Sequence, residues 1–158
     1  MAVDIFYSSL GWVGLRLSNG LLCELVFGKR RRGEVEGVLG RAHGSGSAKD
    51  LVSDLKAYLK GCKVDFKGYS VASSQLTSFE EKVLCECGKI GYGKCCTYAE
   101  LARSCGRPRA YRAVGSALAK NPTPIVVPCH RVLSQDGIGG YSQGLALKKA
   151  LLKIEGII

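Results

Sequence analysis

The segment around Cys129 combines residue types that could make a reactive thiol. Residues 125–132 read IVVPCHRV, so a single cysteine stands between a proline and a His-Arg pair, behind an apolar β-branched run. A thiol is a nucleophile only as the thiolate, and an ordinary cysteine with a pKa of about 8.5 is mostly protonated at neutral pH. A neighbouring imidazole and guanidinium favour the anion. The same residues also suit a buried, inert cysteine beside a solvated basic pair, and the segment alone does not separate these interpretations.

A predicted helix upstream of Cys129 bears on this choice. Residues 108–120 read PRAYRAVGSALAK, and after Arg112 the side chains are small and nearly without hydrogen-bonding reach. A helix that reads base edges presents Arg, Lys, Asn or Gln instead. A smooth surface with one long cation suits sequence-independent approach to DNA, although an alanine-rich core helix with a solvated Arg112 is the alternative. DNA binding beside an activated thiol indicates chemistry on a base, which enzymes reach by flipping it out of the stack.

The whole chain is basic. Its 158 residues include 23 Lys and Arg against 13 Asp and Glu, a formal net charge of +10 to which both halves contribute. Such a surplus predicts a polyanionic partner rather than any particular fold. No stretch approaches the roughly 20 continuous apolar residues that cross a bilayer, and the N-terminus lacks the pattern of a signal peptide. We therefore expect a soluble, cytoplasmic, nucleoid-associated protein without a membrane partner.

Eight cysteines are many for an intracellular chain of this length. Five of them lie within residues 85–105, but the chain contains no C-x-x-C pair and only two histidines, so we expect no metal site. Buried structural thiols, or a stabilising disulfide as in intracellular hyperthermophile proteins, are the alternatives. The sequence assigns neither partners nor a function to Cys23, Cys62, Cys85, Cys87, Cys95, Cys96 and Cys105.

The first 75 residues predict a small strand-rich domain. Asn19-Gly20 is a strong hairpin signal, because both residues tolerate a positive φ. The linker-like composition of residues 68–77 indicates a domain boundary near residue 75. We expect strands over 3–7, 12–17, 21–27 and 63–66, a helix over 48–59, and a mobile basic loop over 28–47.

After this boundary the apolar spacing becomes helical. Ser78 and Glu81 have the S-x-x-E form of a capping box, and Thr97 and Glu100 repeat it. Two short helices joined by a glycine-containing turn are the outline of a helix-turn-helix. We expect one helix that starts at 78 and a second that starts at the Thr97 capping box and ends near 104. Two more helices should run over 108–120 and 145–155, and the last one should bury Leu147, Ala150, Leu151 and Ile154.

Taken together, these residues resemble the O6-alkylguanine-DNA alkyltransferases, the methylated-DNA–protein-cysteine methyltransferases. The resemblance covers residues 78–158, whereas the first 75 residues match only in general pattern. It implies an α+β protein with a strand-rich, RNase H-like N-terminal domain (1–75). The C-terminal DNA-binding and alkyl-acceptor domain (76–158) would be mainly helical, with a winged helix-turn-helix. The matching segments are Thr97–Ala102, Arg112–Gly115, Asn121-Pro122, Pro128–Val132, Gly140–Ser142 and Glu155-Gly156.

The resemblance also implies roles for individual residues. Cys129 would take the alkyl group from guanine O6 and keep it as a thioether, so the protein reacts once and needs no cofactor. His130 would remove the thiol proton through a water, oriented by Glu155, and Tyr98 would protonate the departing guanine. Further implied residues are Asn121 as a hinge, Lys148 near the thiol, Val132, Tyr141 and Ser142 around guanine, Arg112 in place of the flipped nucleotide, Tyr111, Ala113 and Gly115 at the minor groove, and Arg107 and Gln135 near phosphates.

Other functions fit part of the sequence. A non-catalytic alkylation-damage sensor or a helix-turn-helix regulator would bind DNA without using Cys129, although the smooth helix offers few base-reading side chains. A cysteine hydrolase would use the thiol but leaves the basic charge unexplained. Relatives that recognise damage without repairing it carry Trp or Ala in place of the reactive cysteine, so Cys129 favours repair. The expected partner is double-stranded DNA containing O6-alkylguanine, bound by a monomer, with cooperative binding left open.

Overall fold

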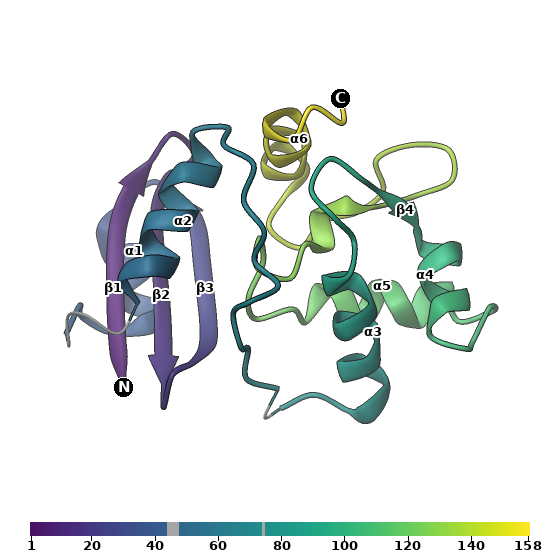
Figure 1. Ribbon diagram of the computed structural model, residues 1–158, viewed down its shortest axis with the longest axis horizontal. Helices are drawn as coiled ribbons and strands as arrows, with labels where there is room; N and C mark the ends of the chain where they lie inside the picture. Colours follow the sequence, from purple (N-terminus) through teal and green to yellow (C-terminus); the bar gives the residue numbers. More distant parts are fainter. Residues whose placement is uncertain (44–47, 74) are drawn as a thin grey trace. The chain divides into compact units, whose positions relative to one another are not determined.

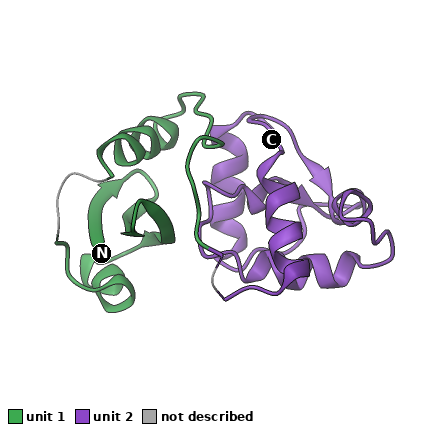
Figure 2. Cartoon of the chain, turned by 60° about the horizontal axis from the view of Figure 1, so that its bottom comes forward, with its two compact units in different colours: residues 1–72 green, residues 73–158 purple. Residues whose placement is uncertain are grey.

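The computed structural model describes residues 1–43, 48–73 and 75–158 of the chain. By its internal contacts the chain divides into two compact units, Met1–Ala72 and Ser73–Ile158 (Figure 2). The architecture is mixed, with an antiparallel sheet in unit 1 and mainly helices in unit 2. Among the residues described, no helix is both long and apolar enough to cross a membrane.

Unit 1 is built on a three-stranded antiparallel sheet in the order β1-β2-β3 (Figure 1). The β2–β3 hairpin turns at Asn19 and Gly20, whose φ angles are +52° and +79°. The Asn-Gly pair therefore forms the turn that the sequence predicts, with positive φ at both central residues. The strands are β1 (Ala2–Ser8), β2 (Gly11–Ser18) and β3 (Leu21–Lys29), which confirms the three expected strands.

Helix α1 (Arg32–Leu39) lies inside the segment predicted as a mobile loop, so that prediction is wrong for these residues. Residues 44–47 of the same segment lie outside the described ranges. The helix buries Val35 and Leu39, four residues apart on one face, against the sheet. A Cβ on Gly14 of β2 would lie only 2.2 Å from Val35 Cγ1, so glycine allows this close approach. Tertiary packing rather than intrinsic propensity stabilises so short a helix.

Helix α2 (Lys49–Leu59) confirms the helix expected over 48–59 and lies on the other face of the sheet (Figure 1). Residues 63–66, predicted as a strand, have no regular structure. Phe66 is instead buried with its ring centroid 5.6 Å from that of Tyr58 in α2. The apolar residues of this stretch therefore pack on a helix and pair with no strand.

Part of the segment predicted as a linker, residues 68–77, pairs with β3. The Leu22 N–H donates to the Ser70 carbonyl at 2.9 Å, and the Ala72 N–H donates to the Leu22 carbonyl at 2.8 Å. These residues therefore add to the edge of β3, which offers unpaired backbone groups, and the boundary between the two units falls within this segment, after Ala72. Ser74 lies outside the described ranges.

Unit 2 is mainly helical, as the change of period predicts. Helices α3, α4 and α5 pack on one another around one hydrophobic core. A short parallel sheet joins β4 (Cys96–Thr97) to β5 (Val132–Leu133), with Thr97 opposite Leu133. The helices are α3 (Ser78–Gly88), α4 (Tyr98–Ser104), α5 (Tyr111–Ala119) and α6 (Leu145–Ile154), with a 3-10 turn η1 (Cys129–Arg131) between α5 and β5.

Capping boxes start two of these helices. For α3 the N-cap is Thr77, one residue before the predicted Ser78: the Thr77 hydroxyl accepts the Glu80 N–H, and the Glu80 carboxylate accepts the Thr77 N–H. The box therefore has the form T-x-x-E. For α4 the predicted pair, Thr97 and Glu100, makes both bonds. Each box satisfies backbone donors that would otherwise lack partners at the helix start.

The last two helices depart from prediction in detail. Helix α5 begins at Tyr111, and Pro108 lies in a preceding turn closed by a 2.9 Å bond from the Ala110 N–H to the Arg107 carbonyl. Helix α6 ends at Ile154, close to the predicted end, but it completely buries Lys148. Of the four residues expected to be buried, Leu151 is buried and three are half-buried: Leu147, Ala150 and Ile154.

Candidate active site

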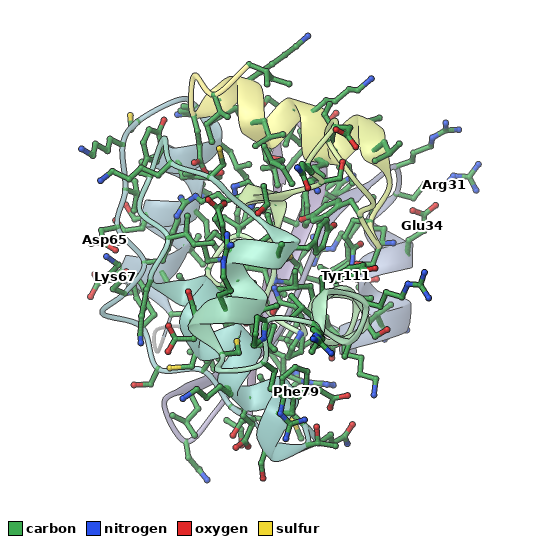
Figure 3. The ribbon with its side chains drawn as sticks, turned by 90° about the vertical axis from the view of Figure 1, so that its right-hand side faces the viewer. Arg31, Glu34, Asp65, Lys67, Phe79 and Tyr111 are labelled. Carbon is green, nitrogen blue, oxygen red and sulfur yellow. The ribbon has the colours of Figure 1, made fainter. Side chains whose placement is uncertain are left out.

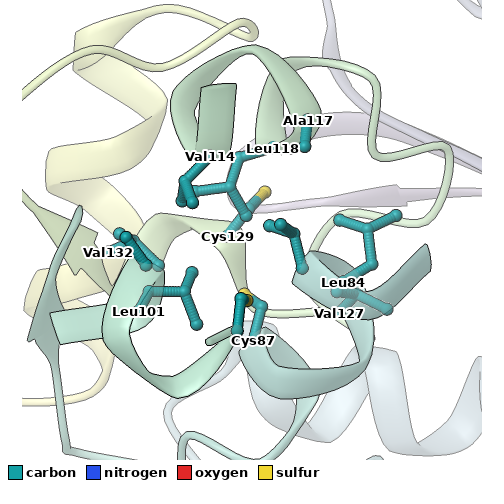
Figure 4. Packing of buried hydrophobic residues seen from close by; sticks show 12 residues of the cluster. Leu84, Cys87, Leu101, Val114, Ala117, Leu118, Val127, Cys129 and Val132 are labelled. Carbon is teal, nitrogen blue, oxygen red and sulfur yellow. The ribbon is translucent and has the colours of Figure 1, made fainter. Parts of the chain in front are cut away.

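Cys129 opens the turn η1 and is only 6 % exposed. Figure 4 shows it within the core of unit 2, close to Val114 and Leu118 of α5. The Asn121 Nδ2 group donates to its Sγ at 3.1 Å. Burial raises the pKa of the Cys129 thiol, while hydrogen bonds from Asn121 and Tyr141 oppose the rise. The thiol is therefore mostly protonated at neutral pH, and its reaction requires a base.

Asn121 ties the end of α5 to the segment that leads into Cys129. Its Nδ2 group also donates to the Val127 carbonyl at 2.9 Å, and its Oδ1 accepts the Thr123 N–H at 3.0 Å. Between these anchors Ile125 is buried with a φ of +74°. A β-branched residue rarely adopts this conformation, which costs on the order of 1–3 kcal/mol. The surrounding contacts therefore hold a strained turn just before the thiol.

His130 and Arg131 share one buried carboxylate, Glu155, which caps the end of α6. The His130 Nε2 lies 2.7 Å from Glu155 Oε1, and the Arg131 Nε donates to Oε2 at 2.8 Å. The Gly93 N–H donates to Oε2 at 3.1 Å. A buried carboxylate needs such partners, because leaving it unpaired costs several kcal/mol. Burial lowers the pKa of His130 despite the Glu155 charge, so the imidazole is neutral at pH 7 and able to accept a proton.

Lys148 is completely buried and holds two backbone carbonyls. Its Nζ donates to Val132 at 2.7 Å and to Gly140 at 2.9 Å. The Tyr98 hydroxyl donates to the same Gly140 carbonyl at 3.2 Å, so ammonium and phenol meet at one acceptor. Burial lowers the pKa of Lys148 to about 8 and raises that of Tyr98. Tyr98 therefore keeps its proton at neutral pH and can donate it.

A pocket of about 350 Å³ opens beside Cys129. Its walls are mostly apolar and aromatic, with few polar groups, which suits a flat ring of the size of a nucleobase. Helix α5 and the 140–142 loop supply seven of its nine lining residues. The lining residues are Tyr98, Tyr111, Gly115, Leu118, Ala119, Cys129, Gly140, Tyr141 and Ser142.

Comparison with known proteins decides which family this arrangement represents. The sequence profile of the 6-O-methylguanine DNA methyltransferase DNA-binding domain matches residues 78–157, which contain the whole site. The chain belongs to the O6-methylguanine-DNA methyltransferase family. A methylated-DNA–protein-cysteine methyltransferase of Sulfolobus acidocaldarius is 39% identical over 108 residues, which are 68% of this chain and 67% of that protein.

Solved structures of the family match nearly the full chain. The Mycobacterium tuberculosis OGT in complex with DNA superposes with a TM-score of 0.81 at 30% identity, covering 98% of this chain and 92% of that one. The O6-methylguanine-DNA methyltransferase of Pyrococcus kodakaraensis has a TM-score of 0.74 at 32% identity and covers 98% of both chains. The mixed fold with an N-terminal antiparallel sheet is thus that of the methyltransferases.

The fold brings most of the predicted catalytic and substrate residues of this methyltransferase together. Asn121 contacts Cys129, and His130 contacts Glu155, whereas Val132 has its side chain in the core and offers its carbonyl to Lys148. Its expected place at the guanine stays a prediction. The predicted residues that line the pocket with Cys129 are Tyr98, Tyr111, Gly115, Tyr141 and Ser142.

The predicted DNA-contacting residues Arg112 and Ala113 lie exposed on α5, and Gln135 is exposed after β5. Arg107 lies in the turn before α5, with its guanidinium carbon 4.9 Å from the ring centroid of Phe79. This cation–π contact orients the side chain before any DNA binds. No DNA is present, so the phosphate and groove contacts of these residues stay predictions.

Sequence reasoning missed two residues of the site. The sequence pattern predicts Arg131 only as a cation flanking the thiol, yet its side chain is buried and bonded to Glu155. The signal is an arginine inside an apolar motif, because a buried arginine needs a carboxylate partner. Gly139 has a φ of +76°, and a Cβ there would lie 2.9 Å from the Tyr98 ring. No local pattern distinguishes this glycine from its neighbours, since its constraint comes from a residue about forty positions away.

All eight cysteines are free thiols in the structure. Cys87 and Cys105 are buried in the core that contains Cys129, whereas Cys62, Cys85 and Cys95 are exposed. Within the described ranges, no group of three or more His, Cys, Asp or Glu side chains is arranged to hold a metal ion.

Proposed function

We propose that this protein repairs O6-alkylguanine in DNA by transferring the alkyl group irreversibly to Cys129. One observation carries the proposal: the thiol of this methyltransferase borders a base-sized pocket, and the residue after it is bonded to a buried carboxylate. In the reaction the Cys129 Sγ attacks the alkyl carbon, a C–S bond forms, and the bond from that carbon to guanine O6 breaks. The product is a thioether on the protein, so each molecule reacts once.

Proton transfer follows from the hydrogen bonds. Because Glu155 engages His130 at Nε2, we assign the acceptance of the Cys129 proton, through a water, to Nδ1. The lowered pKa of His130 leaves its imidazole neutral and the raised pKa of Cys129 leaves its thiol protonated, which are the states that this transfer starts from. Glu155 then stabilises the imidazolium, as the acid of a hydrolytic triad does.

The leaving group is guanine, which would otherwise depart as an anion. Tyr98 lines the pocket with its proton retained, and we assign the protonation of guanine to its hydroxyl. Lys148 holds the Gly140 carbonyl to which Tyr98 donates, so it positions this acid. Tyr141 and Ser142 also line this pocket and would contact the base.

DNA binding is assigned to unit 2. We propose that α4 and α5 form a winged helix-turn-helix, that Arg112 fills the space of the flipped nucleotide, and that residues 1–75 are RNase H-like. A short turn between two helices and a three-stranded sheet with helices on both faces support these assignments. The net charge of +10 supports a DNA partner. We propose that the protein binds DNA as a monomer and that it is cytoplasmic and nucleoid-associated.

The test is a reaction with duplex DNA that carries one O6-methylguanine. We expect the mass of one methyl group on the peptide that contains Cys129, and one lesion repaired per protein molecule even with DNA in excess. Cys129→Ser should bind the DNA and repair nothing, whereas Cys85→Ser, which removes an exposed thiol, should react normally. An intact lesion with unmodified Cys129 would overturn the proposal and favour a damage sensor. Repair beyond one lesion per molecule would contradict the single-use mechanism.

A further inference from the structure

Tyr111 has a position that a DNA-groove contact does not explain. It is the first residue of α5, its side chain is 49 % exposed, and it lines the pocket that contains Cys129. Figure 3 labels it among the side chains of this part of unit 2. A half-exposed aromatic ring on a pocket wall lies where the pocket meets solvent. Its place is therefore at the mouth through which a base would enter.

The spacing of residues along α5 gives the helix three different faces. Val114, Ala117 and Leu118 are buried in the core. Arg112 and Ala113 are exposed and absent from the pocket lining. Tyr111 belongs to a third face, which borders the core face at Leu118: with Gly115, Leu118 and Ala119 it lines the pocket, and positions i, i+4, i+7 and i+8 share one side of a helix.

Gly115 completes this wall. It has no side chain, and the Tyr98 ring lies 3.8 Å from the position that a Cβ would occupy. The Tyr98 ring therefore packs close to the helix backbone at Gly115, and Tyr111 lies one turn before Gly115 in α5. Two aromatic residues, Tyr98 and Tyr111, thus line one mostly apolar pocket, which suits a flat, π-faced ligand.

We propose that Tyr111 is a positioning residue for the extrahelical nucleotide, holding the flipped base by contact with its ring at the pocket mouth. The inference rests on the proposed function and adds to it a contact inside the base site. When an aromatic residue that stacks on a base is replaced by alanine, the equilibrium constant for binding the base usually falls about fivefold to hundredfold. The ring rather than the hydroxyl carries the effect.

The test separates reaction in the pocket from binding to DNA. With duplex DNA carrying O6-methylguanine, we expect Tyr111→Ala to lower the rate constant at saturating protein by about tenfold. Affinity for undamaged duplex should change less than twofold. Tyr111→Phe should react as wild type, and Tyr111→Leu should be intermediate. The matched control is Tyr7→Ala, which removes a more exposed tyrosine from β1 in unit 1.

A second substrate carries the lesion opposite an abasic site, where no base pair must open. The same tenfold loss there supports contact with the flipped base. A loss confined to the paired substrate would overturn the inference in favour of assistance with flipping. Lost affinity with an unchanged saturated rate, a wild-type rate in Tyr111→Ala, or an equal loss in Tyr7→Ala would each also overturn it. If wild-type protein transfers no methyl group, the proposed function itself fails, which is a separate result.

Discussion

Replacing Gly139 by alanine tests how precisely Tyr98 must be placed. The new Cβ would lie 2.9 Å from Tyr98 Cε2, 3.2 Å from its hydroxyl oxygen and 3.0 Å from the Ser134 nitrogen. Forcing a methyl group into packed surroundings costs about 1–3 kcal/mol, and the left-handed φ of +76° costs alanine about 1–2 kcal/mol more. We expect the free energy of unfolding to fall by about 2–5 kcal/mol, and the Tyr98 ring to move away from its 3.2 Å bond to Gly140.

The same displacement of Tyr98 should also slow the reaction. A displacement of about 1 Å of a catalytic group costs on the order of 100-fold in rate. We therefore expect Gly139→Ala to transfer the methyl group about 100-fold more slowly at saturating protein, measured by single-turnover kinetics on duplex DNA carrying O6-methylguanine. Gly137→Ala is the matched control in the same segment, because its Cβ would meet only Ser134 Oγ, at 3.8 Å.

A double variant identifies the cause of the rate loss. If Gly139→Ala acts by misplacing the Tyr98 hydroxyl, it should slow a Tyr98→Phe protein very little, since the hydroxyl is already gone. Equal losses in both backgrounds would refute the reasoning, and so would a folded Gly139→Ala protein that reacts at the wild-type rate. Thermal unfolding of each variant ensures that the rates are compared between folded proteins.

Three further predictions concern the surroundings of the thiol and the DNA-facing turn. Asn121→Ala should lower the free energy of unfolding by about 1–3 kcal/mol in urea and slow transfer, because the pKa of Cys129 rises when its donor is lost. Burial lowers the pKa of His130 in the folded state, so between that lowered value and pH 6.5 only the unfolded state binds the proton; wild-type stability should therefore fall more steeply than that of His130→Gln as the pH drops through this range, and parallel curves would contradict this. Phe79→Leu should weaken DNA binding about two- to fivefold in a titration, because Arg107 loses its cation–π partner; unchanged affinity would exclude that role.

Local patterns were sufficient for the elements whose signals are local. The Asn19-Gly20 turn, the capping box at Thr97 and helix α2 are all present as predicted. Each of these features depends on residues that are close together in the sequence. Helix α1 was missed because its stability depends on Val35 and Leu39 packing where Gly14 leaves room. The strand expected over 63–66 does not form for the same kind of reason, since none of the strands in the described part of the chain pairs with these residues.

The sequence by itself determined the chemical identity of the site. A Pro-Cys-His-Arg-Val segment, a smooth basic helix and a late Glu155 in family order were enough to predict alkyl transfer from DNA to Cys129. Tertiary structure alone decided the state of these groups. Burial raises the pKa of the Cys129 thiol, which stays protonated, and lowers the pKa of His130, which stays neutral. The fold also pairs Arg131 with Glu155 and places Gly139 close to the Tyr98 ring, although these residues are distant in sequence. Such effects depend on desolvation and distance, which the order of residues does not specify.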